Sequence, residues 1–270
     1  MDTILHELEP APLLQPYVKT FWTGEFNAEG NSLLAQQVVP NGYIELIFHL
    51  DSDHCLLYQN NTWEKSPTYT LIGLFTKPYE VRFNKKVKVF GIRFKPEGIY
   101  NLFGIPASEF SASYLDMENV LSRQFKTFTS QIHEAQSIDK MIMATEEFLL
   151  HNLKQTSNDI YYLNYAAESI RKTYGILRIE ELMQKVFISQ RQLEREFKQK
   201  IGVTPKHYMR IARMNEINRI LTTGDFNRLT TLSYLNGFSD QAHFIREFKQ
   251  FMGIPPLKFL KNKSQFIVNT

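Results

Sequence analysis

The pentapeptide Arg-Glu-Phe-Lys-Gln occupies residues 195–199 of this chain and returns unchanged at residues 246–250. Three residues after each copy stands a glycine, Gly202 or Gly253. Self-similarity at a fixed offset is typical of a duplicated supersecondary unit. Each copy is preceded by a short helical pattern and a turn, so each predicts two short helices joined tightly.

The two predicted helix-turn-helix units cover residues 178–201 and 229–252. In the first unit, Ser189 suits the N-cap of the second helix. In the second unit, Ser239 or Asp240 suits the same position, and both alternatives stay open at the level of sequence.

The second helix of each unit is expected to have one apolar and one polar side. Leu193 and Phe197 lie four residues apart, as do Phe244 and Phe248, so we expect them to face a core. A helical pattern at 206–222 connects the units and would place both second helices in major grooves about 34 Å apart. The outer side chains, our candidate DNA contacts, are Ser189, Gln190, Arg191, Glu194, Arg195 and Lys198 in the first unit and Ser239, Gln241, His243, Arg246 and Lys249 in the second.

These residue types match the chemistry of base edges and phosphates. Arginine pairs bidentately with guanine and glutamine with adenine, while Glu194 suits either cytosine or the orientation of Arg191. Lys198 and Lys249 suit phosphate contacts or solvated charge better than base reading. His243 has two open roles, contact with DNA and simple packing at the helix surface.

Charge is divided unevenly along the chain. Residues 160–270 contain 18 Lys and Arg against 9 Asp and Glu, whereas residues 1–159 contain 13 basic and 19 acidic residues. This asymmetry indicates a polyanionic partner, double-stranded DNA, for the basic part alone. The chain has no run of 18 apolar residues, and acids and prolines stand where a signal peptide would need a basic start. We therefore expect a cytoplasmic protein without membrane contact.

The first 95 or so residues show strand patterns. Residues 43–50 and 87–95 alternate as half-buried strands do, with Arg93 on the face opposite Phe90, Ile92 and Phe94. Shorter strand candidates lie at 33–39, 54–59, 69–75 and 79–83. Their spacing predicts a β-rich sandwich or barrel with flanking helices.

Helical patterns begin at Pro96, which suits a first helical position. The amphipathic stretch 138–153 either packs on its own domain or forms a dimer seam. Residues 155–159 are polar and form the expected linker. Arg171 and Lys172 are interpreted as charges at a helix C-terminus.

The chain is therefore predicted to be an α+β protein of two domains. Residues 1–155 would form a β-rich regulatory domain with a helical connector, and residues 160–262 an all-α DNA-binding domain. In the first, aromatic and polar side chains suggest an effector pocket, with a structural or exposed role as the favoured alternative for each one: Trp22, Tyr43, Glu45, His49 and Arg93.

Residues 160–262 resemble the DNA-binding domain of the AraC-type transcription regulators. The resemblance rests on residues 237–249 with the Gly-Ile-Pro-Pro that begins at Gly253, and on residues 192–197 with the Gly-Val-Thr-Pro that begins at Gly202. It implies about seven helices and two recognition helices, of which many relatives use the second mainly for backbone contacts. By motif position, the base-facing places fall on Arg191, Glu194, Arg195, Gln241, His243 and Arg246.

The N-terminal part resembles a sensor domain found in a subgroup of that family. The matching pieces include Phe21-Trp22, residues 39–48 and residues 91–98, with Asn41 where relatives often have Asp. The family resemblance implies RNA polymerase as a further partner, and the stretch 138–153 leaves a second copy of the chain open as another. The resemblance of the N-terminal part brings no effector identity.

Two other functions are weighed against an effector-modulated regulator. An enzyme is disfavoured on two grounds. The seven histidines form no close pair of metal ligands, and Cys55 lacks the Pro-Cys context that the acceptor cysteine of a DNA-repair methyltransferase would need. We therefore expect no catalytic residues, cofactor or metal. A DNA-binding regulator controlled by a protein partner or by its own abundance is the second alternative. A closed, mainly apolar pocket would favour an effector, and a filled core would favour this alternative.

Overall fold

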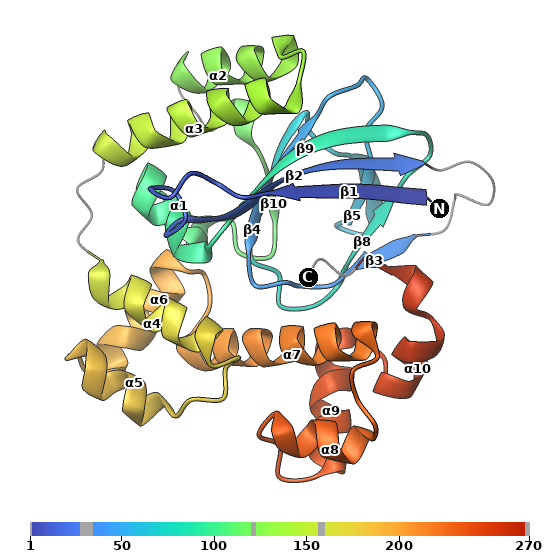
Figure 1. Cartoon of the computed structure of the whole chain (residues 1–270), viewed down its shortest axis with the longest axis vertical. Coiled ribbons are helices and arrows are strands. Elements are labelled where there is room, and N and C mark those ends of the chain that lie inside the picture. The colour runs from blue at the N-terminus through green and yellow to red at the C-terminus, as the bar shows by residue number, and fades with distance from the viewer. Residues whose placement is uncertain (1, 28–34, 120–122, 156–159, 268–270) are drawn as a thin grey trace.

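The structure is a computed structural model that describes residues 2–27, 35–119, 123–155 and 160–267 (Figure 1). Two β-sheets form the N-terminal half and helices form the C-terminal half, as the sequence predicted. The larger sheet has the strand order β1-β2-β9-β4-β7-β10 and the smaller the order β11-β3-β8-β5-β6. The strands are β1 (Asp2–Leu8), β2 (Val18–Asn27), β3 (Gln36–Val38), β4 (Ile44–His49), β5 (Leu56–Gln59), β6 (Thr62–Lys65), β7 (Tyr69–Ile72), β8 (Tyr79–Arg82), β9 (Val87–Phe94), β10 (Tyr114–Asp116) and β11 (Phe266–Ile267).

The larger sheet is covered on both faces, which corrects the prediction of half-buried strands. On β4 and β9, Glu45 and Arg93 are only 5% and 1% exposed. Arg93 Nε donates to Glu45 Oε1 at 2.6 Å, and Arg93 Nη1 donates to Glu7 Oε1 at 2.7 Å. The alternation in the sequence is real, but its polar side holds ion-paired side chains instead of facing solvent.

Three helices cover the outer face of the larger sheet: α1 (Pro96–Phe103), α2 (Arg123–Glu134) and α3 (Ile138–Gln155). Pro96 is the first residue of α1, as predicted. The apolar stripe of α3 packs within this half, because Leu149 is fully buried and the rings of Phe128 and Phe148 stack at 4.3 Å. Residues 156–159 of the predicted linker lie outside the described residues.

The helices of the C-terminal half are α4 (Tyr161–Lys172), α5 (Ile179–Val186), α6 (Gln190–Lys200), α7 (Pro205–Thr223), α8 (Leu229–Leu235), α9 (Gln241–Met252) and α10 (Pro256–Lys261). The long helix α7 lies between the group α4–α6 and the group α8–α9 (Figure 1), as expected of the connector. Short 3-10 helices occur at η1 (Ala107–Glu109), η2 (Met117–Asn119) and η3 (Lys263–Gln265). No helix in the described ranges has the length and apolarity needed to span a bilayer.

A buried ion pair joins the two halves. Arg171, on α4, contacts the Glu97 carboxylate of α1 with both of its terminal nitrogens, and its Nη1 also donates to the Tyr208 hydroxyl at 2.9 Å. Burial opposes the charge of Arg171, but Glu97 outweighs it and raises the pKa of Arg171 above its ordinary value. Arg171 therefore holds the halves together, beyond its predicted role at a helix end, whereas Lys172 pairs within α4 with Glu168.

Candidate nucleic-acid interface

The first helix-turn-helix unit consists of α5 and α6. Phe187 follows α5 with a φ of 54°, a left-handed conformation that bulky residues rarely adopt. Ser189 then caps α6, since its hydroxyl accepts a hydrogen bond from the N–H of Gln192 at 3.2 Å. Leu193 and Phe197 are fully buried, so the inner side of α6 is the one that their spacing predicted.

The outer side of α6 presents most of the predicted contact residues to solvent. Glu194 is half-buried and accepts from Gln190 Nε2 at 2.9 Å, so it orients Gln190 and not Arg191. Arg195 meets Glu196 at 3.2 Å with 70% of its side chain exposed, and such surface pairs open easily. The exposed side chains on this side are Ser189, Gln190, Arg191, Arg195 and Lys198.

The second unit consists of α8 and α9. Gly237 has a φ of 74° in the turn, and Asp240 caps α9 by accepting from the N–H of His243 at 2.7 Å. That hydrogen bond lowers the pKa of Asp240, so the cap stays charged. Ser239 is not the cap but donates to Asp240 at 3.3 Å. Phe248 is fully buried, like Phe244 before it.

The outer side of α9 is partly restrained by its own unit. Gln241 Oε1 accepts from Thr230 at 2.7 Å. The His243 ring lies edge-on to Phe238, with 5.4 Å between ring centroids. Both side chains are half-buried, whereas Arg246 and Lys249 are exposed. The basic groups of α9, Arg246 and Lys249, are therefore less restrained than Gln241 and His243, its two predicted polar contacts.

Four of the cationic side chains that were predicted to contact DNA make no ion pair within the described part of the chain. They are all exposed, two on α6 and two on α9: Arg191, Lys198, Arg246 and Lys249. Unpaired surface cations on the outer sides of two helices suit phosphate and base contacts. We refer to α6 and α9 as the reading helices.

Two further cations were missed by the sequence analysis. Arg178 and Arg228 are exposed and immediately precede α5 and α8, the first helices of the two units. The same residue type at the same place in both copies was the available signal. Exposed cations at the start of the first helix of each unit suit contacts to the DNA backbone.

A cavity of 70 Å³ lies in the N-terminal half, lined from both sheets. Trp22, Glu45 and His49, from the predicted pocket set, line it among mainly apolar side chains. Glu45 is already engaged, because its Oε2 accepts from Trp22 Nε1 at 2.9 Å and its Oε1 from Asn41 at 3.1 Å. Arg93 holds the same carboxylate through the ion pair described above.

His49 adds no charge to this cavity at neutral pH. Burial lowers the pKa of His49 to about 4. Its Nε2 lies 3.0 Å from Ser66 Oγ and 3.7 Å from Cys55 Sγ. Across the described ranges, no group of three or more His, Cys, Asp or Glu side chains is placed to hold a metal ion.

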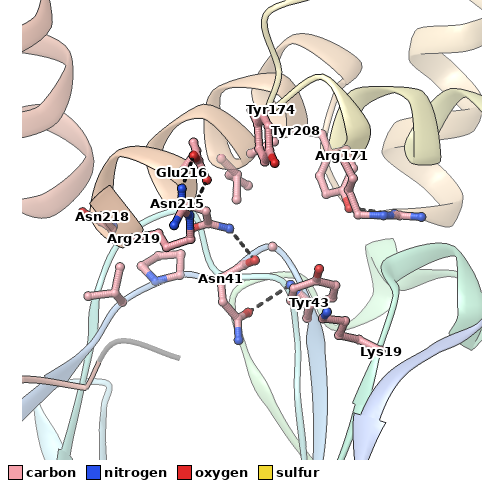
Figure 2. A pocket seen from close by; sticks show the side chains of 15 residues that line it. Lys19, Asn41, Tyr43, Arg171, Tyr174, Tyr208, Asn215, Glu216, Asn218 and Arg219 are labelled. Atoms are coloured by element: carbon pink, nitrogen blue, oxygen red, sulfur yellow. Dashed lines mark hydrogen bonds and ion pairs between the residues drawn. The ribbon is translucent and has the colours of Figure 1, made fainter. Parts of the chain in front are cut away.

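A second cavity, of 260 Å³, lies between the two halves (Figure 2). Tyr43 lines it, apart from the other predicted pocket residues. The loop before β4 meets α7 there, because Asn215 Nδ2 donates to the carbonyl of Asn41. The predicted pocket set is therefore split: Trp22, Glu45 and His49 line the first cavity, Tyr43 lines the second, and Arg93 lines neither.

Two family models match this chain. A domain of unknown function matches residues 6–116, and a helix-turn-helix domain matches residues 182–262. The second match includes both reading helices. The first falls on the β-rich half.

Known proteins with related sequences are regulators. A probable transcription factor of Proteus vulgaris, PqrA, is 33% identical over 105 residues, which are 39% of this chain and 83% of that protein. The Msm operon regulatory protein of Streptococcus mutans is 29% identical over 118 residues, or 43% of this chain and 42% of that protein. The chain thus spans less than half the length of this second relative.

A solved structure shares the fold. It is an apo variant of ToxT from Vibrio cholerae, with a TM-score of 0.50 and 12% sequence identity. The match covers 89% of this chain and 97% of that one, so the similarity extends over both halves.

Proposed function

This chain belongs to the AraC-type family of transcription regulators, and we propose that it binds double-stranded DNA sequence-specifically through α6 and α9. The observation that carries this proposal is that each reading helix has one side buried in the core and an opposite side that exposes unpaired cations. Each helix buries two repeated aromatic or aliphatic side chains and turns unpaired cations outward. Two such helices at the ends of one connector suit neighbouring sites on one duplex.

The dimensions of the connector fit this arrangement. Helix α7 has 19 residues, and at 1.5 Å per residue it is about 28 Å long. Successive major grooves on one face of B-DNA are about 34 Å apart. We propose that Arg191, Arg195 and Arg246 contact base edges, and that Lys198 and Lys249, with Arg178 and Arg228, contact phosphates.

The N-terminal half, residues 1–155 in our division of the chain, is proposed to sense a small effector. Support comes from the mainly apolar cavity lined by Trp22, Glu45 and His49. The domain of residues 160–262 would respond to it by binding DNA differently. RNA polymerase and a second copy of the chain are proposed as further partners, in the cytoplasm.

The test is the salt dependence of DNA binding. The affinity should fall steeply with salt, because each phosphate contact releases counterions. Lys198→Ala should weaken binding to every sequence and lower the slope of log affinity against log salt by roughly one unit. Lys140→Ala, which removes an exposed lysine of α3 in the N-terminal half, is the matched control and should change neither quantity.

An effect of Lys198→Ala at one sequence position alone would contradict its phosphate role. Equal effects of Lys198→Ala and Lys140→Ala would contradict the placement of the interface on α6.

A further inference from the structure

The chain ends by returning to the N-terminal half. After α10, strand β11 pairs in parallel with β3, with Phe266 opposite Gln37 and Ile267 opposite Val38. The N–H of Val39 donates to the carbonyl of Ile267 at 3.0 Å. One of the two edge strands of the smaller sheet therefore comes from the DNA-binding half.

This C-terminal strand is also tied to the second reading helix. The Phe266 ring lies edge-on to Phe259 with centroids 5.1 Å apart, and Phe259 lies edge-on to Phe248 of α9 at 5.8 Å. Lys263 Nζ donates to the carbonyl of Leu221, in the last turns of α7, at 2.7 Å. Packed rings thus run from the core of the second unit to the sheet.

The same strand closes the cavity of the N-terminal half. Ile267 lines that cavity together with Val38, its neighbour on β3. The cavity measures 70 Å³, whereas pockets for small effectors usually measure about 300–1,000 Å³. An effector of ordinary size can enter only if part of the wall moves.

Strand β11 is the shortest strand of the cavity wall among the described residues, and it lies at the edge of its sheet. It has two residues, both half-buried, and one neighbouring strand, whereas β2, β4 and β9 lie within the larger sheet and pair on both sides. An edge strand of two residues is displaced more easily than a strand paired on both sides.

We propose that β11 is a latch that competes with the effector: an uncharged, mainly apolar molecule enters the cavity by displacing Ile267 and releasing β11 from β3. The inference rests on the proposed sensing role of this half. The ligand class follows from the lining, in which Glu45 is already neutralised by Arg93 and His49 carries no charge. Release removes the link that β11 makes between the second unit and the smaller sheet, while the Glu97–Arg171 pair still holds the first unit. Because the two events are thermodynamically linked, anything that favours the pairing of β11 with β3 lowers the affinity for the ligand by the same factor.

A reversible cross-link tests the latch. Gln37→Cys with Phe266→Cys places two thiols on directly opposed residues. The natural Cys55 can stay, because burial raises its pKa to about 11 and keeps the thiol protonated and unreactive. The probe is N-phenyl-1-naphthylamine, an uncharged apolar fluorophore whose emission rises in an apolar cavity.

The oxidised variant is expected to bind the probe at least tenfold more weakly than the same protein after reduction. A chain that ends at Gln265 should bind it more tightly than the intact chain does. An Ala212→Trp change, which fills the second cavity between the two halves, should preserve both differences, since Ala212 lines that cavity and does not line the first.

Equal probe affinity of the oxidised and reduced forms would overturn the proposal. So would weaker binding by the shortened chain, no probe binding by any form, or failure of the two cysteines to cross-link. DNA affinity measured in parallel separates this inference from the proposed function. If DNA binding depends on salt but the cross-link and the shortening do not change probe binding, only the latch proposal is contradicted. If no form binds DNA, the proposed function as a DNA-binding regulator is contradicted.

Discussion

The two helix-turn-helix units share one architecture and differ in how they are held. The carbonyl of Gly202, just after α6, accepts from Ser111 of the N-terminal half at 3.0 Å. A Cβ added at Gly202 would lie 2.2 Å from the Ser111 hydroxyl oxygen, whereas one added at Gly253, its counterpart after α9, has nothing within 4 Å among the described atoms. The first unit is fixed beside its reading helix, and the second is joined through α7 and β11.

The turns of the two units differ in residue type at one backbone position. Phe187 and Gly237 both have positive φ, at 54° and 74°. Phe187 is 91% exposed, so its ring gains no packing in return for an unfavourable backbone conformation. The two units therefore share the same backbone conformation in the turn, whereas contacts with residues outside the repeat determine how firmly each unit is attached to the rest of the chain.

The largest expected effect comes from breaking the buried ion pair beside the first unit. Arg171→Met leaves the Glu97 side chain, 2% exposed, without its compensating charge, and such a loss costs about 3–5 kcal/mol. The matched variant beside the second unit is Arg210→Met. Arg210 lies 2.9 Å from Glu247, and the two side chains are 24% and 29% exposed, respectively. That change should cost about 1 kcal/mol. Urea unfolding measures both, and equal losses would contradict the comparison.

An intermediate effect is expected at the two glycines. Gly202→Ala and Gly253→Ala both place an alanine at positive φ, which costs about 1 kcal/mol each. Gly202→Ala also disturbs the Ser111 hydrogen bond, which adds roughly another 1 kcal/mol. In thermal unfolding, Gly202→Ala should have a lower Tm than Gly253→Ala. Adding Ser111→Ala should reduce this difference in Tm, because it removes the clashing oxygen. A gap that Ser111→Ala leaves unchanged would show that the contact is not its cause.

The smallest effect has opposite signs in the two turns. Phe187→Gly relieves the positive φ without loss of packing, so it should raise the free energy of unfolding by about 0.5 kcal/mol. Gly237→Phe should lower it by about 1 kcal/mol. Chemical denaturation of the two variants provides the measurement. Destabilisation by Phe187→Gly would mean that the ring is held by contacts that its exposure does not reveal.

The repeat made the C-terminal half predictable. Leu193, Phe197, Phe244 and Phe248 could be assigned to the core because their spacing fits one helix face, and all are fully buried. The cap at Ser189 followed from local chemistry alone. These features depend on neighbours within a few residues, so a single sequence contains them.

Features that depend on distant partners were not predictable. The ion pairs of Arg93 could not be predicted from the alternation of its strand, because its partners, Glu45 and Glu7, are 48 and 86 residues away. The ion pair of Arg171 with Glu97 and the return of β11 to β3 likewise join remote segments. A two-residue strand has no periodicity, and strand β1 offered too weak an alternation to be assigned.

The most direct test of the two-groove account is the selection of bound sites from random DNA with the purified chain. The account predicts two preferred elements with centres about 10–10.5 base pairs apart on one face of the duplex. Arg195→Ala should lose preference in one element and Arg246→Ala in the other, each at a cost of about 1–3 kcal/mol. A single element, or loss by both variants at the same position, would contradict the claim that α6 and α9 enter separate grooves.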